Sequence, residues 1–241
     1  EKCVRSVFDQ TIFNLIDEII IVLDSSKDKS GEILYDLQNK ISKIKIIKVN
    51  FGSLSKSRNL GISSSNSEYI AILDGDDFWI KTKLEEQYNA IKDIDKEFGL
   101  IYTNYLDLSN EEINKAQKVS VRSFNKILDY QLIKYFCKDG PIIPSTLLIK
   151  SKVFESIGKF DENLKYYEDT DFYLRLLEKY KIFHLPIYSC YKRRHQNQIT
   201  NKLFELIPNG DQVIEKSVLR NKNLKKFKKT RQTRNRNKAA I

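Results

Sequence analysis

Three aspartates, Asp74, Asp76 and Asp77, come directly after a short apolar run, EYIAIL at residues 68–73. Such a run is typical of a buried strand, and in open α/β sheets ligands bind at the carboxyl ends of the strands. Carboxylates this close repel one another unless a positive group lies between them. A divalent cation with a diphosphate suits them, because Mg²⁺ and Mn²⁺ bind one or two carboxylates together with phosphate oxygens. A solvated acidic turn is the other interpretation, and the motif alone does not select a reaction.

Three further segments carry residue types that can do chemistry. The loop at 50–61, NFGSLSKSRNLG, contains Arg58, whose planar guanidinium can pair with phosphate or with the aspartates. The segment EDTD at 168–171 opens a helical pattern, where acids either complement the helix dipole or supply an ionised general base. His195 lies in the basic segment KRRHQNQ at 192–198, which is either a solvated loop or a loop that closes over a diphosphate.

The elements that must position these side chains alternate between strand and helix patterns. This alternation predicts an α/β fold with a mostly parallel sheet flanked by helices. Segment 141–149 is extended in pattern, whereas 110–140 has no clear pattern. The strand patterns lie at 18–23, 44–49, 68–73, 99–105 and 182–188, and the helix patterns at 30–40, 58–63, 83–94, 153–157 and 169–181.

The amino-terminal residues have the pattern of a helix, with Val4, Phe8 and Ile12 on one face. A parallel sheet would normally place a strand ahead of such a helix. The sequence contains no Met and begins at Glu1. We therefore expect a first strand to be missing from this sequence, so that the sheet would contain an empty slot.

Composition restricts the class of protein. The chain has 241 residues, of which 41% are hydrophobic and 31% charged, as in one ordinary globular domain. No apolar run approaches the roughly 18–20 residues of a membrane-spanning helix. The three cysteines, Cys3, Cys137 and Cys190, fit neither a metal knuckle nor a disulfide framework, which favours a reducing, cytoplasmic location.

The net charge of +10 is concentrated in the tail at 216–241, which holds 11 of the 42 basic residues and no acid. The rest of the chain is close to neutral, so we do not expect nucleic acid as a partner. The tail could hold the protein at the inner face of a membrane by attracting anionic lipid, at about 1 kcal/mol per basic residue. A solvated extension is the alternative.

Four segments in this order resemble the family 2 glycosyltransferases of the GT-A fold, over residues 1–200. Each segment alone is weak evidence, but four in order with plausible gaps make a strong match. The resemblance implies a GT-A domain at 1–200 and a helical basic extension at 201–241. The segments are EIIIVLDSSKDKS at 18–30, G-x-x-x-x-S-R-N-x-G at 52–61, EYIAILDGDD at 68–77 and GKFDENLKYYEDTDFYLRL at 158–176.

The resemblance also implies a role for each candidate residue. Asp169 would be the general base that deprotonates the acceptor hydroxyl, and Glu168 would help to position the acceptor. Mn²⁺ or Mg²⁺ would bridge the diphosphate of the donor. The nucleotide would lie against Asp24, Ser26, Arg58 and Asp74, and the metal would lie against Asp76, Asp77 and His195.

The implied activity is inverting transfer of a sugar from a nucleotide-sugar, usually a UDP-sugar, to a glycan or lipid-linked acceptor in envelope synthesis. A single base with an in-line displacement inverts the anomeric centre. A sugar nucleotidyltransferase on a related scaffold and a truncated, non-catalytic glycan- or nucleotide-binding module are the alternatives. The donor sugar, the acceptor and the oligomeric state are not predictable from the sequence.

Overall fold

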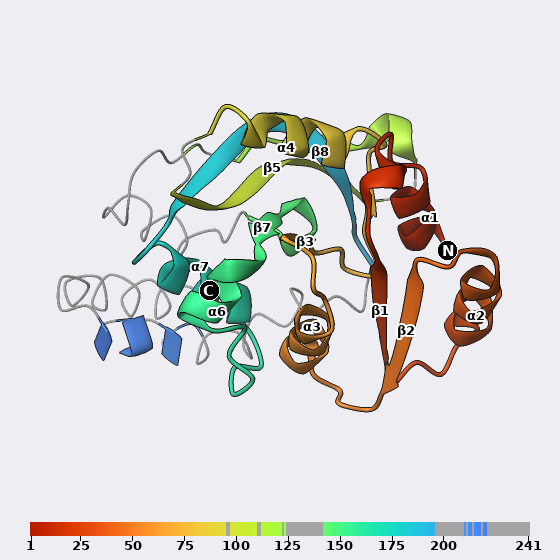
Figure 1. Ribbon diagram of the computed structural model, residues 1–241, viewed down its shortest axis with the longest axis horizontal. Coiled ribbons are helices and arrows are strands. Elements are labelled where there is room, and N and C mark those ends of the chain that lie inside the picture. Colours follow the sequence, from red (N-terminus) through yellow and green to blue (C-terminus); the bar gives the residue numbers. More distant parts are fainter. Residues whose placement is uncertain are drawn as a thin grey trace, which may run out of the picture.

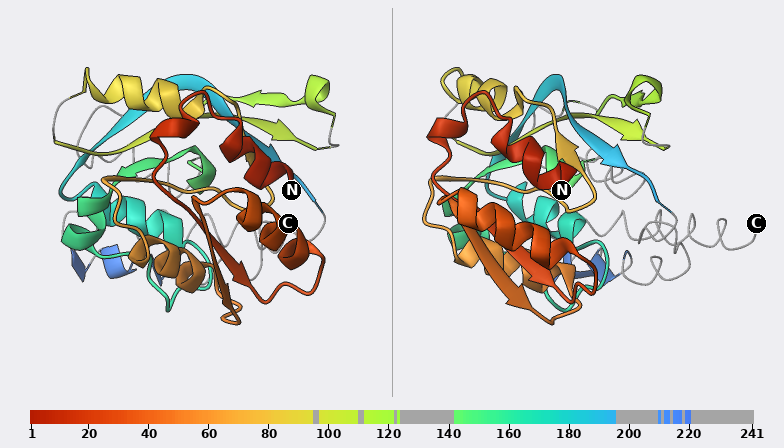
Figure 2. Two further views of the ribbon diagram at one scale, coloured as in Figure 1. Left: turned by 45° about the vertical axis from the view of Figure 1, so that its right-hand side comes forward. Right: turned by 90° about the vertical axis from the view of Figure 1, so that its right-hand side faces the viewer.

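The computed structural model describes residues 1–94, 97–109, 112–121, 123 and 142–195, and near the carboxyl end 210, 212–213, 215–217 and 219–220. Figure 1 shows a large arched sheet on one side of the molecule and a pair of strands, β1 and β2, beside it. Helices pack against both parts, and Figure 2 shows from two further sides that α2 runs along the strand pair.

The elements alternate much as the sequence patterns predict. The strands are β1 (Ile19–Asp24), β2 (Ile44–Val49), β3 (Tyr69–Ala71), β4 (Phe78–Trp79), β5 (Phe98–Leu108), β6 (Gln117–Val119), β7 (Leu148–Lys150) and β8 (Lys181–Arg193). The helices are α1 (Lys2–Phe8), α2 (Ser30–Lys40), α3 (Leu54–Ser63), α4 (Lys83–Ile91), α6 (Ser151–Ile157) and α7 (Glu168–Leu176), with short 3₁₀ turns η1 (Phe13–Leu15), η2 (Ile113–Lys115) and η3 (Pro144–Thr146).

The strands form two separate sheets. β1 and β2 pair in parallel, with Ile19 opposite Ile44 and Asp24 opposite Val49. The larger sheet has six strands in the order β3-β7-β5-β8-β4, with β6 added beside β5. The α/β class is confirmed, but the expectation of a mostly parallel sheet is wrong for the larger sheet. Among the described strands of that sheet, only β5 and β8 pair in parallel. β7 inserts antiparallel between β3 and β5, and β4 and β6 also pair antiparallel.

The hydrophobic core lies between β5 and α7. Leu100, Ile101 and Tyr102 of β5 are fully buried. Phe172 of α7 is also fully buried, and its ring lies 5.3 Å from the ring of Phe154 and 5.0 Å from that of Phe160. This packing fixes α7, whose first residues are the predicted catalytic acids, against α6 and the turn that precedes α7.

The predicted amino-terminal helix is confirmed as α1, which is fixed to the segment around β4. Ser6 Oγ accepts a hydrogen bond from the backbone N–H of Trp79 at 3.0 Å. The side chain of Gln10 donates to the carbonyl oxygen of Ile80 at 2.9 Å and accepts from the N–H of Leu84 at 3.0 Å. α1 therefore has a defined place although no described strand leads into it.

The helical extension is described only between positions 210 and 220. Its described residues are helical there, and Val213 and Ser217 are buried. Lys216 pairs with Asp161, and Arg220 lies 3.4 Å from a carboxylate oxygen of Asp171. These two tail cations thus face acids of the protein itself, whereas most of the basic tail lies outside the described residues. Within the described part of the chain, no helix is both long enough and apolar enough to cross a membrane.

Lys83 in α4 is an unusual buried cation. Its Nζ donates to Gln87 Oε1 at 2.7 Å and to the carbonyl oxygen of Leu147 at 3.3 Å, and it lies 4.3 Å from the ring centre of Trp79. Burial lowers the pKa of Lys83 to about 7. The folded protein therefore binds fewer protons here than the unfolded chain between about pH 7 and pH 10.

Substituting Lys83→Met removes this titration. The free energy of unfolding of the wild type should rise relative to that of the variant as the pH increases from 7 to 9, by up to about 1.4 kcal/mol per pH unit. Urea unfolding of both proteins at pH 7, 8 and 9 measures the difference. If the difference stays constant with pH, Lys83 is equally charged in the folded and unfolded states.

Candidate active site

Arg58 of α3 joins two carboxylates that are far apart in the sequence. Its Nη2 lies 2.7 and 3.0 Å from the two oxygens of Asp74, and its Nη1 lies 2.7 Å from Oε1 of Glu168. The Arg58 side chain is only 8% exposed, and the ring of Phe160 lies beneath its guanidinium. Hydrogen-bonded ion pairs of this buried kind are costly to break from one side.

The cluster around Arg58 contains more negative than positive charge, because Asp169 follows Glu168 at the start of α7. Burial alone would lower the pKa of Arg58, but the charges of Asp74 and Glu168 raise it above its ordinary value, so the guanidinium stays charged. Burial and the charge of Asp169 raise the pKa of Glu168 to about 7. Burial also raises the pKa of Asp169, with Arg58 opposing the effect. Glu168 can therefore take up a proton near neutral pH, and Asp169 binds a proton more readily than an ordinary aspartate does.

The start of α7 is fixed by contacts on both sides. Asn59, next to Arg58, exchanges two hydrogen bonds with the backbone of Phe160, at 2.8 and 3.0 Å. Arg175 donates to Asp171 within α7 and to the carbonyl oxygens of Ile157 and Lys159. These contacts hold the turn before α7 against α3, so the distance between Arg58 and Glu168 is built into the backbone.

The aspartate turn after β3 is fixed by a buried serine. Ser145 Oγ donates to Asp77 Oδ2 at 2.6 Å and accepts from the backbone N–H of Asp74 at 3.1 Å. Asp77 also accepts from the backbone N–H of Arg193 at 3.2 Å. Burial and the neighbouring charges of Asp74 and Asp76 raise the pKa of Asp77 to about 7. Asp77 is therefore engaged within the turn, while Asp76 is left nearer the surface.

Asp76 and His195 lie together although they are 119 positions apart in the sequence. His195 Nε2 is 3.2 Å from Asp76 Oδ2, and the two side chains are 46% and 41% exposed. A carboxylate and an imidazole on an open surface are suitable ligands for a metal cation that also binds phosphate oxygens. The described residues contain no group of three or more His, Cys, Asp or Glu side chains placed to hold a metal ion by themselves.

Asp24 at the end of β1 orders the loop that leads into α3. Its carboxylate accepts hydrogen bonds from the backbone N–H groups of residues 51–53 and from the hydroxyls of Ser25 and Ser57. Although desolvation opposes them, the bonds from Gly52, Ser25 and Ser57 hold the pKa of Asp24 well below its usual range. Ser26 donates to Asp28 within the same turn, at 2.6 Å.

The structure thus brings Arg58, Asp74, Glu168 and Asp169 into one cluster and Asp76 and His195 into a second. Asp24 reaches the first cluster indirectly, through Ser57 beside Arg58. Sequence reasoning missed the supporting residues Ser57, Asn59, Ser145 and Arg193. Ser57 and Asn59 stand inside the S-R-N motif and could have been found there. Ser145 lies in the extended segment 141–149 and Arg193 in the basic segment 192–198, where no local pattern distinguishes them from their neighbours.

Comparison of this sequence with known protein families and proteins identifies the family to which the chain belongs. The sequence model described as glycosyl transferase family 2 matches residues 1–158. The chain belongs to glycosyl transferase family 2. It is 31% identical over 202 residues to an uncharacterized glycosyltransferase of Rickettsia typhi, covering 83% of this chain and 61% of the relative. It is 32% identical over 183 residues to another from Methanocaldococcus jannaschii, covering 73% of this chain and 59% of the relative.

The fold of this family 2 chain also has solved counterparts. The crystal structure of Staphylococcus aureus TarS 1-349 in complex with UDP-GlcNAc superposes with a TM-score of 0.66 and 18% sequence identity, over 90% of this chain and 62% of that one. The complex of the same protein with UDP gives a TM-score of 0.63 and 19% identity, over 88% and 60%. The likeness establishes the GT-A fold. The chain spans about 60% of the length of the two relatives from Rickettsia typhi and Methanocaldococcus jannaschii.

Removing one acceptor oxygen from Asp24 should weaken the loop. In Asp24→Asn, an amide NH₂ replaces one of the two carboxylate oxygens that accept from the N–H groups of 51–53 and from the Ser57 hydroxyl. The donors on that side lose their acceptor, which lowers the free energy of unfolding by about 1–3 kcal/mol at pH 7. The low pKa of Asp24 makes this stabilisation complete above about pH 4 and lost as the pH falls further. Urea unfolding at pH 7 and pH 3 should therefore show a smaller difference at pH 3.

Asp36→Asn, at an exposed position of α2, is the matched control and should change the unfolding free energy by less than about 0.5 kcal/mol. Equal stability of Asp24→Asn and Asp36→Asn at pH 7 would contradict the role given to Asp24.

Proposed function

We propose that the protein is an inverting glycosyltransferase that moves a sugar from a UDP-sugar to an acceptor hydroxyl. The observation that carries this proposal is the contact of Arg58 with both Asp74 and Glu168. It joins the acidic turn after β3, suited to a nucleotide diphosphate, to the pair of acids at the start of α7, suited to a hydroxyl. In this proposal, the side of the site that binds the sugar donor and the side that binds the acceptor hydroxyl meet at the buried guanidinium of Arg58.

The donor side is proposed to lie along the carboxyl ends of β1 and β3. Asp74 would face the ribose, and the turn at 24–26 would face the base. Because the carboxylate of Asp24 is occupied by residues 51–53 and Ser57, we assign Asp24 to fixing the nucleotide loop. The TarS complexes with UDP and UDP-GlcNAc support a UDP-sugar as the donor class for this fold.

Mn²⁺ or Mg²⁺ fits the pair formed by Asp76 and His195, which leaves coordination positions for diphosphate oxygens. When bound, the cation would neutralise charge on the leaving diphosphate. Asp77, which is buried and bonded to Ser145, would keep Asp76 in place.

Asp169 is proposed as the general base. Its raised pKa makes it a stronger base than an ordinary aspartate, which favours transfer of the acceptor's proton to it. The acceptor oxygen would lose its proton to Asp169 and attack the anomeric carbon opposite the diphosphate, so that UDP leaves and the centre inverts. Glu168, held by Arg58, would position the acceptor.

We further propose that the acceptor is a glycan or a lipid-linked glycan of the cell envelope. This finer assignment is supported by the family resemblance and by the basic composition of 216–241. Attraction of that tail to anionic lipid would bring the protein to the surface where such acceptors lie.

Calorimetric titration of the full-length protein with UDP tests the donor side. Binding should require Mn²⁺, and Asp76→Asn should weaken it at least about tenfold, since one charged hydrogen-bonding partner is worth roughly 1.5–3 kcal/mol. Asp36→Asn should bind like the wild type. Metal-independent UDP binding, or normal binding by Asp76→Asn, would contradict the donor site.

Release of UDP from a panel of UDP-sugars tests the acceptor side. Asp169→Asn should slow turnover about 10²- to 10⁴-fold while leaving UDP affinity within a few fold, because a general base acts on the reaction and not on donor binding. In the wild type, kcat should fall as the pH drops through a pKa above the ordinary 4 of an aspartate. Pyrophosphate release would instead indicate a nucleotidyltransferase, and full activity of Asp169→Asn would remove Asp169 from the mechanism.

A further inference from the structure

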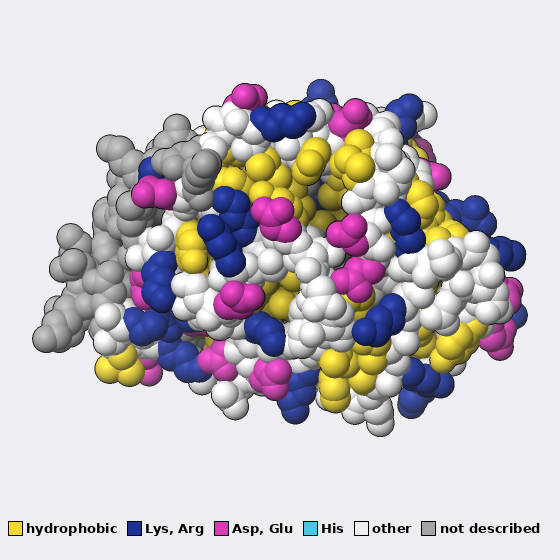
Figure 3. Space-filling model, in the orientation of Figure 1, with side chains coloured by type: hydrophobic (Ala, Val, Ile, Leu, Met, Phe, Trp, Pro, Cys, Tyr) yellow, Lys and Arg dark blue, Asp and Glu magenta, His cyan; other side chains and the backbone are white. Residues whose placement is uncertain are grey.

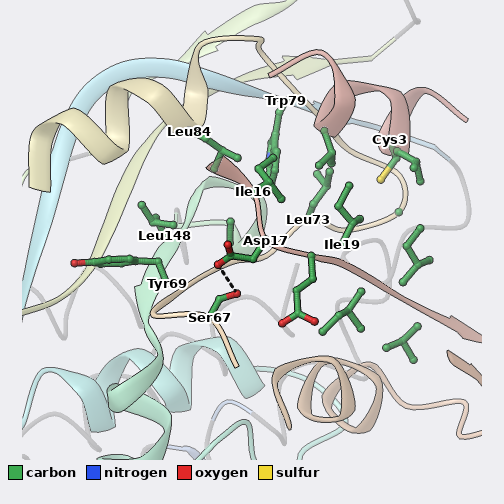
Figure 4. A pocket seen from close by; sticks show the side chains of 18 of the residues that line it. Cys3, Ile16, Asp17, Ile19, Ser67, Tyr69, Leu73, Trp79, Leu84 and Leu148 are labelled. Atoms are coloured by element: carbon green, nitrogen blue, oxygen red, sulfur yellow. Dashed lines mark hydrogen bonds between the residues drawn. The ribbon is translucent and has the colours of Figure 1, made fainter. Parts of the chain in front are cut away.

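The aspartate turn after β3 borders a cavity of about 650 Å³. Leu73 and Gly75, on either side of Asp74, line this cavity, and residues 19–23 of β1 line it too (Figure 4). On the face of the molecule that Figure 3 shows, hydrophobic side chains gather below α4, and Leu84 of that helix also borders the cavity. Because open space adjoins the turn on this side, its position depends on the contacts that hold it elsewhere.

The carboxyl end of β8 supplies such contacts. The guanidinium of Arg193 donates from Nε to the carbonyl oxygen of Asp76 and from Nη2 to that of Gly75, the second at 3.5 Å. The backbone N–H of Arg193 donates to Asp77 Oδ1 at 3.2 Å. Two positions later His195 meets the same turn, with its Nε2 3.2 Å from Asp76 Oδ2. Residues 193 and 195 therefore face the turn, as alternate residues of an extended chain face one side.

Arg194, between these two residues, joins the end of β8 to β5 instead. Its Nε lies 2.7 and 2.8 Å from the two oxygens of Asp107, and its Nη2 also donates to Oδ2 of that carboxylate. Its backbone N–H donates to the carbonyl oxygen of Leu108 at 2.9 Å. The Asp107 side chain is only 8% exposed, so its charge requires this bidentate partner. Arg194 is thus held by both its backbone and its side chain, directly before His195.

We propose that Arg194 is a positioning residue for His195. Its pair with Asp107 fixes the end of β8 against β5, and Arg193 fixes the aspartate turn against the same end of β8. The two ligands of the proposed cation site, Asp76 and His195, are thereby held together although both side chains are partly exposed. The inference rests on the proposed function, because it takes these two side chains as ligands of Mn²⁺ or Mg²⁺.

Charge alone predicts the opposite effect for the loss of Arg194. Removing a positive charge near a cation site makes the binding of a cation more favourable. A positioning role predicts weaker binding, because His195 would no longer be held at its distance from Asp76. Residues that orient metal ligands from outside typically contribute about 10- to 100-fold to metal affinity. The direction of the change therefore distinguishes positioning from a general electrostatic effect.

Paramagnetic broadening by Mn²⁺ tests the inference without a measurement of activity. The sequence contains two histidines, so the ring C–H signals of His184 and His195 can be followed by proton NMR and assigned with His184→Gln. The ring of His184 in β8 lies 4.9 Å from that of Tyr102 in β5, so its signal reports whether the two strands are paired. Mn²⁺ is titrated into the protein with UDP present, and the concentration that doubles the width of the His195 signal is measured.

In the wild type, Mn²⁺ should broaden the signal of His195 at lower concentrations than that of His184. Arg194→Met should need at least about tenfold more Mn²⁺ for the same broadening, and Arg194→Lys, which keeps the charge but loses the planar fork, should also need more. Lys192→Met is the matched control, because it removes the same charge two positions earlier on β8, where Lys192 lies 5.8 Å from the ring centre of Tyr105. This control should need no more Mn²⁺ than the wild type.

A wild-type response of Arg194→Met with the His184 signal unchanged would overturn the inference and leave the proposed function in place. Equal weakening in Arg194→Met and Lys192→Met would overturn it as well. If Arg194→Met does not fold, Arg194→Lys decides by the same criterion. Absence of broadening at His195 in the wild type would instead contradict the cation site of the proposed function, and the inference with it, so the two failures are distinguishable.

Discussion

The buried pairing of Arg58 with Asp74 and Glu168 is the interaction on which the candidate site depends. A guanidinium away from water requires carboxylate partners, and two carboxylates placed near Asp169 require a cation. α3, the turn after β3 and the start of α7 each supply one member. The site therefore exists only when these three elements are packed together, and the rest of the structure can be understood as the means of holding them.

Two sets of contacts provide that support. Asn59 and Arg175 attach the turn before α7 to α3 and to the carbonyl oxygens of residues 157–159. Ser145 and the backbone of Arg193 fix the aspartate turn. On the open side, Asp76 and His195 remain partly exposed, as the proposed diphosphate site requires. Rigid support behind a partly exposed pair is a suitable arrangement for binding and reacting a charged substrate.

The sequence was most informative where chemistry and periodicity are local. The helix at 30–40 and the strand at 44–49 have the bounds that their patterns predict, since an amphipathic face and an apolar run show directly in the order of residues. α3 begins at Leu54, earlier than the predicted 58, because Ser53 caps it within a loop-like stretch. The antiparallel direction of β7 was missed, because an apolar pattern is the same for either strand direction. Ser145 and Arg193 act through long-range contacts that no local pattern reveals.

A double-mutant cycle on Arg58 and Glu168 tests most directly whether one buried cation holds the two sides of the site together. The variants are Arg58→Met, Glu168→Gln and the double variant, each compared with wild type by its free energy of unfolding in urea. Arg58→Met alone should cost about 3–5 kcal/mol, since it leaves uncompensated carboxylates, and the two changes should be coupled by roughly 2 kcal/mol or more. Additivity within about 0.5 kcal/mol would show that the contact does not organise the site.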